Sequence, residues 1–392
     1  FQLIMKKKIA ILGSTGSIGK SLINILKKDK KNIEICLLTA HKNYKELFKQ
    51  IQTFNVKNII ITDPNSYLKV KKLLKKRKIN ILSSLDALNK IFIKKKIDYT
   101  MSAISGFSGL KPTLDIIKYS KTIAIANKES IICGWSLIKK KLKKYNTQFI
   151  PVDSEHFSIW SLTNKLSHNN IEKVFITASG GPFKNYPIKK FKSITRKQAL
   201  KHPSWSMGKK ISIDSATMMN KVFEIIEAKK IFNLRYNQLE ILVHPKSYVH
   251  ALVKFNNGLL KILVHDTDMT IPIFNSLYQN NEKKIKSKKI DISLLNNLNL
   301  ENVDTKRFPI IKLIDTLPEQ ESLFETIIVS ANDCLVKNFL NNKLNFLDIY
   351  KILSKIIKKK EFQKYKSIKP RNIGQIRSLN DYVSLKINSM SV

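Results

Sequence analysis

Acidic residues stand close together at one point of the chain where two carboxylates could bind a metal ion. Asp153, Ser154 and Glu155 follow Pro151 and Val152, and an extended backbone would place the first and third of these polar side chains on the same side. Such a pair suits a hard cation such as Mg²⁺ or Mn²⁺, which takes oxygen ligands and often keeps open positions for substrate or water. A solvated turn is the ordinary alternative, so a third carboxylate has to be sought elsewhere.

A second polar stretch runs from Asp214 to Glu227, opens with capping residues and then has helical spacing. Asn220, Lys221 and Glu224 would be neighbours on this helix, since residues three or four positions apart lie about one turn above each other. Together they can hold an anionic substrate and a metal ion. Because one turn presents only one carboxylate at its best position, we take Glu224 and not Glu227. An N-capped surface helix without a ligand is the alternative.

Two further segments suit phosphate binding and closure over a substrate. Ser179 begins a Ser-Gly-Gly-Pro-Phe run that follows a predicted strand and offers a hydroxyl and a flexible backbone. His202 and Trp205 lie in a polar segment that ends at Gly208, which suits a lid that excludes water. A loop anchored by one buried tryptophan explains the second segment equally well.

Three glycines near the start of the chain indicate a nucleotide-binding turn. Gly13, Gly16 and Gly19 lie between a predicted strand and a predicted helix, and the whole chain has only 11 glycines. Glycines here allow a tight turn, close approach of backbone N–H groups to a pyrophosphate and close helix packing. A tight turn without a ligand is the alternative. Phosphate contacts are predicted for Thr15, Gly16, Ser17 and Ile18.

The residues after the second predicted strand favour NADP over NAD. An NAD enzyme usually has Asp or Glu at this place to hold the ribose hydroxyls, and that carboxylate would repel a 2′-phosphate. Here Ala40, His41, Lys42 and Asn43 follow the strand. Lys42, Asn43 and the loop backbone can bind a 2′-phosphate. The absence of an acid is stronger evidence for NADP than the presence of Lys42, because lysine is abundant throughout this chain.

Alternating strands and helices must position these residues, and they predict an α/β protein with several domains. Residues 1–150 are predicted to form an N-terminal Rossmann-like, doubly wound sheet that binds NADPH, and residues 151–278 a central α+β domain for metal and catalysis. Residues 279–304 connect to a C-terminal helical domain at 305–392. The strands expected in the first domain are Ile9 to Leu12, Ile33 to Thr39, Asn58 to Thr62, Tyr99 to Ser102 and Lys121 to Ala126.

Composition limits the function classes. The chain has 392 residues and a net charge of +42, yet only six of its 71 basic residues are arginine. A surface selected for nucleic acid would concentrate basic residues with arginine and exposed aromatics, so no functional nucleic-acid partner is expected.

No membrane segment is expected either, because a glycine-rich turn interrupts the first apolar stretch. Met5 has the features of a natural start, which would make Phe1 to Ile4 an extension outside the fold. Widely separated cysteines without metal-ligand spacing indicate a reducing, cytoplasmic setting; they are Cys36, Cys133 and Cys334.

Taken in order, these motifs resemble those of the 1-deoxy-D-xylulose 5-phosphate reductoisomerase family along essentially the whole chain. The match at the C-terminal region is looser and rests on residues 331–333. The motifs are GSTGSIG at 13–19, ANKES at 126–130, PVDSEH at 151–156, SGGPF at 179–183, HPSWSMG at 202–208 and SATMMNKVFEIIEA at 215–228.

The resemblance implies roles for individual residues and a homodimer. Metal ligands would be Asp153, Glu155 and Glu224. Substrate contacts would come from Ser154 and Lys128, phosphate contacts from Ser179, Ser215, Asn220 and Lys221, and the closing loop from His202 and Trp205. NADPH contacts would come from residues 15–18, from His41, Lys42 and Asn43, and from Asn127, Glu129 and Gly208. Two residues depart from the family pattern: His41 replaces a small residue, usually glycine, and an arginine is missing after Met269.

The implied reaction joins an isomerisation to a reduction. A divalent metal (Mg²⁺ or Mn²⁺, with Co²⁺ as a further candidate) would stabilise the enediolate formed when 1-deoxy-D-xylulose 5-phosphate is cleaved by retro-aldol chemistry. NADPH would reduce the rearranged aldehyde to 2-C-methyl-D-erythritol 4-phosphate, in isoprenoid precursor biosynthesis by the non-mevalonate pathway. One rival is an aldehyde dehydrogenase with Cys133 as nucleophile, which leaves the acid cluster unexplained. The other is a basic nucleotide-binding or nucleic-acid-binding module without catalysis.

Overall fold

The computed structural model describes residues 6–92, 97–163, 166, 168–205, 207–279, 283–287, 289 and 291–390. The predicted extension Phe1 to Ile4, and Ser206 of the segment at 202–208, lie outside the described residues. Contacts between residues divide the chain into two units. The first unit comprises Phe1–Ser130, Leu137–Asp153 and Met269–Ile285; the second comprises Ile131–Ser136, Ser154–Asp268 and Lys286–Val392.

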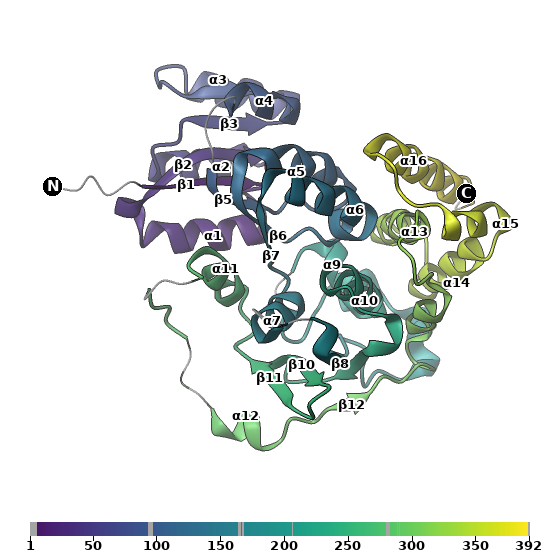
Figure 1. The fold of residues 1–392 in the computed structure, drawn as a ribbon. Helices are drawn as coiled ribbons and strands as arrows, with labels where there is room; N and C mark the ends of the chain where they lie inside the picture. Colours follow the sequence, from purple (N-terminus) through teal and green to yellow (C-terminus); the bar gives the residue numbers. More distant parts are fainter. Residues whose placement is uncertain are drawn as a thin grey trace. The chain divides into compact units, whose positions relative to one another are not determined.

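A seven-stranded sheet forms the centre of the first unit (Figure 1), in the order β4-β3-β2-β1-β5-β6-β7. Every neighbouring pair of strands is parallel, which confirms the predicted doubly wound α/β fold. The short outer strands β4 and β7 were not among the strands expected from the sequence. The strands are β1 (Lys7–Leu12), β2 (Ile33–Ala40), β3 (Asn58–Ile61), β4 (Asn80–Leu82), β5 (Ile97–Ser102), β6 (Ser120–Ile125) and β7 (Gln148–Pro151).

Apolar strands and amphipathic helices explain this first unit. In β1, Ile9 to Leu12 are all 0% exposed, as expected for a parallel strand that is covered on both faces. The helix α1 has its buried residues on one side and packs beside α11 (Figure 1). The helices that contribute to this unit are α1 (Ser17–Lys27), α2 (Tyr44–Thr53), α3 (Pro64–Leu73), α4 (Leu88–Ile91), α5 (Leu110–Ile116), α6 (Lys128–Tyr145) and α11 (Thr270–Leu277).

The segment 269–285 joins the first unit although it lies far along the chain. The hydroxyl of Tyr99 in β5 is 2.7 Å from the hydroxyl of Ser276 in α11. The ammonium group of Lys7 donates to the carbonyl of Leu277 at 2.6 Å. A buried hydroxyl pair and a main-chain contact therefore fix α11 to the first sheet.

A five-stranded mixed sheet forms the second unit, in the order β11-β10-β8-β9-β12. The strands β8 and β9 are parallel, and the other neighbours are antiparallel. The helices α7 (Ser154–Thr163) and α10 (Met219–Phe232) pack against this sheet and against each other. The strands are β8 (Ile171–Ala178), β9 (Leu239–Val243), β10 (Val249–Phe255), β11 (Leu260–Val264) and β12 (Glu301–Asn302).

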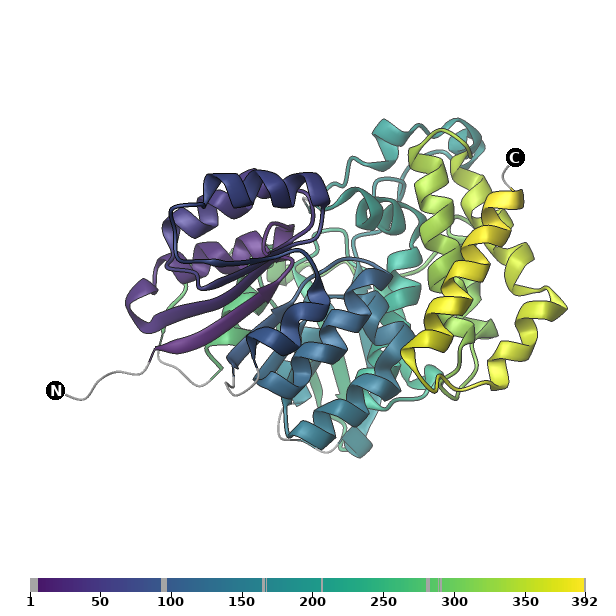
Figure 2. The same ribbon diagram turned by 90° about the horizontal axis from the view of Figure 1, so that it is seen from above.

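The remaining helices belong to the same second unit. The helix α13 packs against both α14 and α16, and Figure 2 shows these helices in green-yellow to yellow. Within the described part of the chain, no helix combines the length and the apolar character needed to cross a bilayer. The helices are α8 (Arg196–Ala199), α9 (Lys209–Thr217), α12 (Ile292–Asn296), α13 (Phe324–Leu340), α14 (Phe346–Ile357), α15 (Lys360–Gln363) and α16 (Ile373–Met390).

Candidate active site

The glycine turn after β1 leaves backbone groups accessible and has no space for side chains. Gly13 has a φ of +82°, and a Cβ atom there would lie 2.7 Å from the carbonyl oxygen of Ala103. A Cβ atom at Gly19 would lie 2.6 Å from Cα of Ser14. Gly16 is the N-cap of α1, makes no side-chain cap and is exposed, and the first turn of the helix carries no acid. These features fit an anion at the helix N-terminus.

The loop after β2 holds the residues predicted to meet the 2′-phosphate. Lys42 is exposed. The side chain of Asn43 accepts a hydrogen bond from the backbone N–H of Glu46 at 3.2 Å, so it caps α2. Nδ1 of His41 lies 2.9 Å from the hydroxyl of Thr62. Lys42 is therefore the cationic side chain of this group that extends into solvent, while its two neighbours also stabilise the loop.

Asn127 is largely committed to the structure of the first unit. Its side-chain oxygen accepts from the N–H of Ser130 at 2.5 Å and caps α6. Its amide nitrogen donates to the carbonyls of Gly106, at 2.8 Å, and Ile104. The next residue, Lys128, forms an ion pair with Asp153 at 2.9 Å, while Glu129 is 5% exposed. The ANKES motif thus starts a helix and directs a lysine to the predicted metal ligand.

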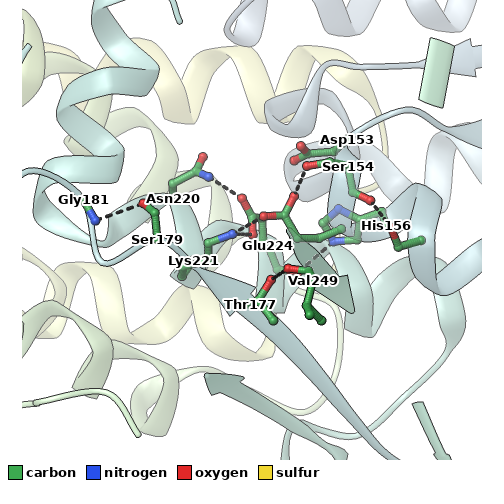
Figure 3. Close-up of polar contacts among 12 residues, drawn as sticks. Asp153, Ser154, His156, Thr177, Ser179, Gly181, Asn220, Lys221, Glu224 and Val249 are labelled. Atoms are coloured by element: carbon green, nitrogen blue, oxygen red, sulfur yellow. Dashed lines mark hydrogen bonds and ion pairs between the residues drawn. The ribbon is translucent and has the colours of Figure 1, made fainter. Parts of the chain in front are cut away.

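A buried charged cluster lies between α7 and α10 (Figure 3). The ammonium group of Lys221 donates to Glu155 and, at 2.5 Å, to Glu224. The side-chain amide of Asn220 donates to the other carboxylate oxygen of Glu224, and the hydroxyl of Ser154 donates to Glu155 at 2.5 Å. Glu155, Glu224 and Lys221 are 9%, 1% and 7% exposed. Three charges are therefore held out of water by mutual pairing.

Pairing keeps these groups ionised in spite of burial. Burial alone would lower the pKa of Lys221, but Glu155 and Glu224 together raise it above its usual value. Burial alone would raise the pKa of Glu155, but Lys221 holds it below its usual value. The cluster therefore contains anionic oxygen atoms next to a cation at neutral pH.

This cluster fits a divalent metal. Glu155 and Glu224 each offer a carboxylate oxygen within 4.8 Å of the other, and the ammonium group of Lys221 shows that the pair already binds a cation. Asp153 is joined by a peptide bond to Ser154, so chain connectivity keeps a third carboxylate near the pair (Figure 3). Three hard oxygen donors of this kind suit Mg²⁺ or Mn²⁺.

Two local expectations for these motifs are wrong. The backbone at Glu155 is not extended, because β7 ends at Pro151 and α7 begins at Ser154. Asp214 does not open the next helix either, because it lies inside α9 and bonds to Asn332 at 2.7 Å. The helix predicted from Asp214 onward is divided at Met218, whose φ of 68° ends α9 and starts α10. Asn220, Lys221 and Glu224 remain neighbours because all three follow that break.

The predicted phosphate residues approach one another through a tight loop. Gly181 has a φ of +63°, and a Cβ atom there would lie 2.9 Å from the carbonyl oxygen of Ser215. Its N–H donates to the hydroxyl of Ser179 at 3.1 Å. Only glycine allows the loop that carries Ser179 to approach the end of α9 so closely. The structure thus brings Ser179 near the segment that carries Ser215.

His202 is fixed as a neutral imidazole. Its Nδ1 accepts from the N–H groups of Ser204, at 3.1 Å, and Trp205, at 2.9 Å, so Nε2 must carry the proton. Nε2 lies 3.1 Å from the hydroxyl of Ser179. Burial, and then the charge of Lys221, lower the pKa of His202 to about 4. At neutral pH, His202 therefore donates a hydrogen bond toward Ser179.

Sequence reasoning missed two histidines in this unit. His250 and His265 stack with ring centroids 3.7 Å apart, and Trp205 meets His250 edge-on at 6.2 Å. An isolated histidine in the apolar run of β10 was the available signal for His250. Cys133, the nucleophile of the dehydrogenase rival, is 1% exposed within α6, where it could not attack a substrate.

Comparisons with known proteins support one family. Models described as "1-deoxy-D-xylulose 5-phosphate reductoisomerase", "1-deoxy-D-xylulose 5-phosphate reductoisomerase C-terminal domain" and "DXP reductoisomerase C-terminal domain" match residues 9–134, 149–232 and 265–382. The 1-deoxy-D-xylulose 5-phosphate reductoisomerase of Pelagibacter ubique is 69% identical over 98% of this chain and 100% of its own length. The enzyme of the same name from Phocaeicola vulgatus is 37% identical over 91% of this chain and 92% of its own length.

Solved structures of that enzyme have the same fold. The one from Zymomonas mobilis in complex with NADPH has a TM-score of 0.87 and 31% identity, and the alignment covers 99% of each chain. A DOX-P reductoisomerase in complex with NADPH, fosmidomycin and magnesium has a TM-score of 0.89 and 30% identity, with 98% of each chain covered.

Proposed function

Because the chain belongs to the 1-deoxy-D-xylulose 5-phosphate reductoisomerase family, we propose that the buried cluster around Lys221 is its catalytic site. The chain is an NADP-dependent oxidoreductase. It converts 1-deoxy-D-xylulose 5-phosphate to 2-C-methyl-D-erythritol 4-phosphate with NADPH and a divalent metal. The observation that supports the site most strongly is a pair of buried carboxylates, Glu155 and Glu224, that share one ammonium group.

We assign the metal to Asp153, Glu155 and Glu224. When bound, the metal supplies positive charge at the ketone and neighbouring hydroxyl oxygens of the substrate. Asn220 fixes one oxygen of Glu224 and Ser154 fixes one of Glu155, so these bonds orient both carboxylates before the metal binds. Ser154 also contacts the substrate backbone in this proposal, as does Lys128, which lies beside Asp153.

We assign the substrate phosphate to Ser179, Ser215, Asn220 and Lys221. In the free enzyme the ammonium group of Lys221 pairs with two carboxylates. In the loaded enzyme the ammonium group would pair with the substrate phosphate instead, because the bound metal would then balance the charge of the carboxylates. The Nε2–H group of His202 lies beside Ser179 and would donate to the same phosphate. Trp205, whose N–H holds His202, would exclude water from the site.

We assign NADPH to the glycine turn and the loop after β2. NADPH supplies the hydride that completes the reduction. The N–H groups at 15–18 would bind its pyrophosphate, and Lys42 with His41 and Asn43 its 2′-phosphate. Asn127, Glu129 and Gly208 complete the predicted contacts. The division into 1–150 for NADPH, 151–278 for metal and catalysis, 279–304 as a connecting segment and 305–392 for the helical domain is part of this proposal, and residues 269–278 contribute contacts to the first unit.

A homodimer is the assembly we propose. The strand β11 is the last strand of its sheet, and Leu260 and Ile262 on it are 51% and 40% exposed. An edge strand with exposed apolar side chains suits pairing with a second copy. Light scattering after gel filtration should give twice the mass of the chain. A cytoplasmic location is proposed as well, and the wide separation of Cys36, Cys133 and Cys334 along the sequence supports it.

One assay tests the proposed function. Purified protein is mixed with 1-deoxy-D-xylulose 5-phosphate and NADPH, with Mg²⁺, with Mn²⁺ or with a chelator, and NADPH oxidation is followed. We expect oxidation that needs both substrate and metal, and 2-C-methyl-D-erythritol 4-phosphate as the product. Turnover that persists in chelator would refute the metal assignment. No turnover under any condition, with a folded protein, would refute the function.

A further inference from the structure

Three aromatic rings lie in a row in the second unit, two of them stacked and the third edge-on, and we call this row the stack. The imidazoles of His250 and His265 lie 3.7 Å apart at an angle of 17°, and the indole of Trp205 meets His250 edge-on at 6.2 Å. His250 is 2% exposed and His265 is 8% exposed. The three residues come from β10, from the segment after β11 and from the segment after His202. The stack therefore links parts of the chain that are far apart in sequence.

A bulge in the sheet directs His250 into this stack. In the pairing of β10 with β11, Val249 is opposite Val264 and Ala251 is opposite Leu263, so His250 is the extra residue. A β-bulge re-aims the side chain at that position and occurs often beside active sites. The N–H of His265 donates to the carbonyl of Tyr248 at 3.1 Å and closes the bulge.

Backbone carbonyls fix the orientation of both imidazoles. Nε2 of His250 lies 3.0 Å from the carbonyl of His265, so it must donate. Nδ1 of His265 lies 2.7 Å from the carbonyl of Asp266 and must donate too. Burial lowers the pKa of both rings, so both are neutral at physiological pH and stack without charge repulsion. The remaining ring nitrogen of His265 is buried and has no hydrogen-bond partner among the described residues.

The stack continues into the predicted phosphate site through hydrogen bonds. The backbone N–H of Trp205, not its indole, donates to Nδ1 of His202 at 2.9 Å, and Nε2 of His202 lies 3.1 Å from the hydroxyl of Ser179. A displacement of His265 would therefore be passed on through His250 to Trp205.

We propose that His265 is a positioning residue, which acts through the ring of His250 to hold Trp205, and with it His202, in the geometry that binds the sugar phosphate. The proposal rests on the function proposed above. The ring face of His265 makes the contact, and its unpartnered nitrogen takes no part. A flat ring should therefore largely replace it, even though the hydrogen bond from Nδ1 to the carbonyl of Asp266 is lost.

Two substitutions at one position separate the ring from its nitrogen. His265→Phe keeps a flat ring, and His265→Ala removes it. We expect His265→Ala to raise KM for 1-deoxy-D-xylulose 5-phosphate about two- to tenfold, as for the loss of one aromatic contact, with kcat changed less. His265→Phe should restore KM to within about twofold of the parent. NADPH affinity should stay the same in both. His168→Ala is the matched control, because that ring meets Phe232 at 5.5 Å and makes no ring contact with Trp205 in the described part of the chain.

Fluorescence of Trp205 gives a readout that needs no turnover. The emission of Trp205 is obtained by subtracting the spectrum of a matched Trp205→Phe variant from that of each protein. We expect a shift toward longer wavelength in His265→Ala, because water reaches the indole, and little shift in His265→Phe or His168→Ala. An unchanged KM and emission in His265→Ala would overturn the proposal. So would a His265→Phe variant as impaired as His265→Ala. Failure of the parent to turn over the sugar phosphate would refute the proposed function while the emission still tests the stack.

Discussion

The glycine turn of the first unit and the charged cluster of the second prepare for charged ligands by opposite means. At Gly13 and Gly19 the site depends on missing side chains, because a Cβ atom would meet backbone atoms at 2.7 and 2.6 Å. At Glu155, Lys221 and Glu224 it depends on side chains that balance one another while buried. The first site should therefore fail when atoms are added, and the second when a charge is removed.

The largest expected effect is that of Glu224→Gln, which removes a charge and keeps the shape. We expect kcat to fall by about a hundredfold or more, because electrostatic stabilisation of the reacting oxygens is lost. Calorimetric titration with Mn²⁺ should show weaker binding, while NADPH binding and the circular dichroism spectrum stay the same. Parent-like metal binding and turnover would show that α10 is only structural.

Lys221→Ala should mainly weaken substrate binding, and its effect should be somewhat smaller than that of Glu224→Gln. We expect KM to rise by a factor that corresponds to about 1.5 to 3 kcal/mol, the usual value of a hydrogen bond to a charged group. Glu155 and Glu224 would face each other without a cation, so the melting temperature should fall and recover when Mg²⁺ is added. If Mg²⁺ leaves the melting temperature unchanged in this variant, the carboxylate pair is not the metal site.

In the first unit, Gly19→Ala should be harmful and Gly16→Ala mild. A Cβ atom at position 19 would meet the backbone of Ser14 at 2.6 Å, whereas at position 16 the nearest atom is 3.4 Å away. We expect Gly19→Ala to lose about 1 to 3 kcal/mol of unfolding free energy, as for overpacking, and to bind NADPH poorly. Urea unfolding and NADPH titration of both variants check this. Equal behaviour of the two would mean that close packing does not explain the spacing of the glycines.

Cofactor choice should respond modestly to Lys42→Ala. Lys42 is exposed, so its pairing with a 2′-phosphate is expected to contribute at most about 1 kcal/mol, or roughly fivefold in the preference for NADPH over NADH. The ratio of kcat/KM values with the two cofactors measures this preference. Lys45→Ala, also exposed and three residues further on, is the control and should keep the parent ratio. The prediction is wrong if the parent enzyme shows no preference for NADPH over NADH.

The smallest effect concerns stability in acid. Burial and Lys221 lower the pKa of His202 from 6.5 to about 4. Between these values the unfolded chain binds the proton and the folded chain does not, so the contribution of His202 is full above pH 6.5 and is lost as the pH falls toward 4. The melting temperature of the parent should therefore drop more over this interval than that of His202→Gln. Parallel curves would show that His202 is not held neutral.

The same comparison explains which parts of the molecule could be predicted from sequence. Glycine spacing directly after an apolar strand reports a local backbone requirement. The strand β1 ends at Leu12 as expected and begins two residues earlier, and β2 begins at Ile33 as expected and ends one residue later. The neighbours Asn220, Lys221 and Glu224 follow from helical periodicity alone. Local rules therefore sufficed for these elements and for this group of neighbours.

Long-range contacts and unusual backbone geometry were not predictable. Met218 has a φ of 68°, which no sequence rule assigns to methionine, so the break between α9 and α10 was missed. The stack of His250 on His265 depends on a bulge whose register is set by pairing between strands. Asn127 caps α6 and also donates hydrogen bonds to the loop at Ile104 and Gly106. This combination depends on contacts that appear only in the three-dimensional structure.

The return of α11 to the first sheet has a consequence for protein synthesis. The first unit is assembled from three separated stretches, the last of which is Met269–Ile285. During translation, the hydrogen bond between the hydroxyls of Tyr99 and Ser276 cannot form until Ser276 has been synthesised. The bond from the ammonium group of Lys7 to the carbonyl of Leu277 is delayed in the same way. At elongation rates of about 5 to 20 residues per second, that wait lasts on the order of ten seconds or more. The nascent sheet therefore emerges from the ribosome with one flank uncovered, and the first unit is completed only after residues 154–268 of the second unit have been synthesised.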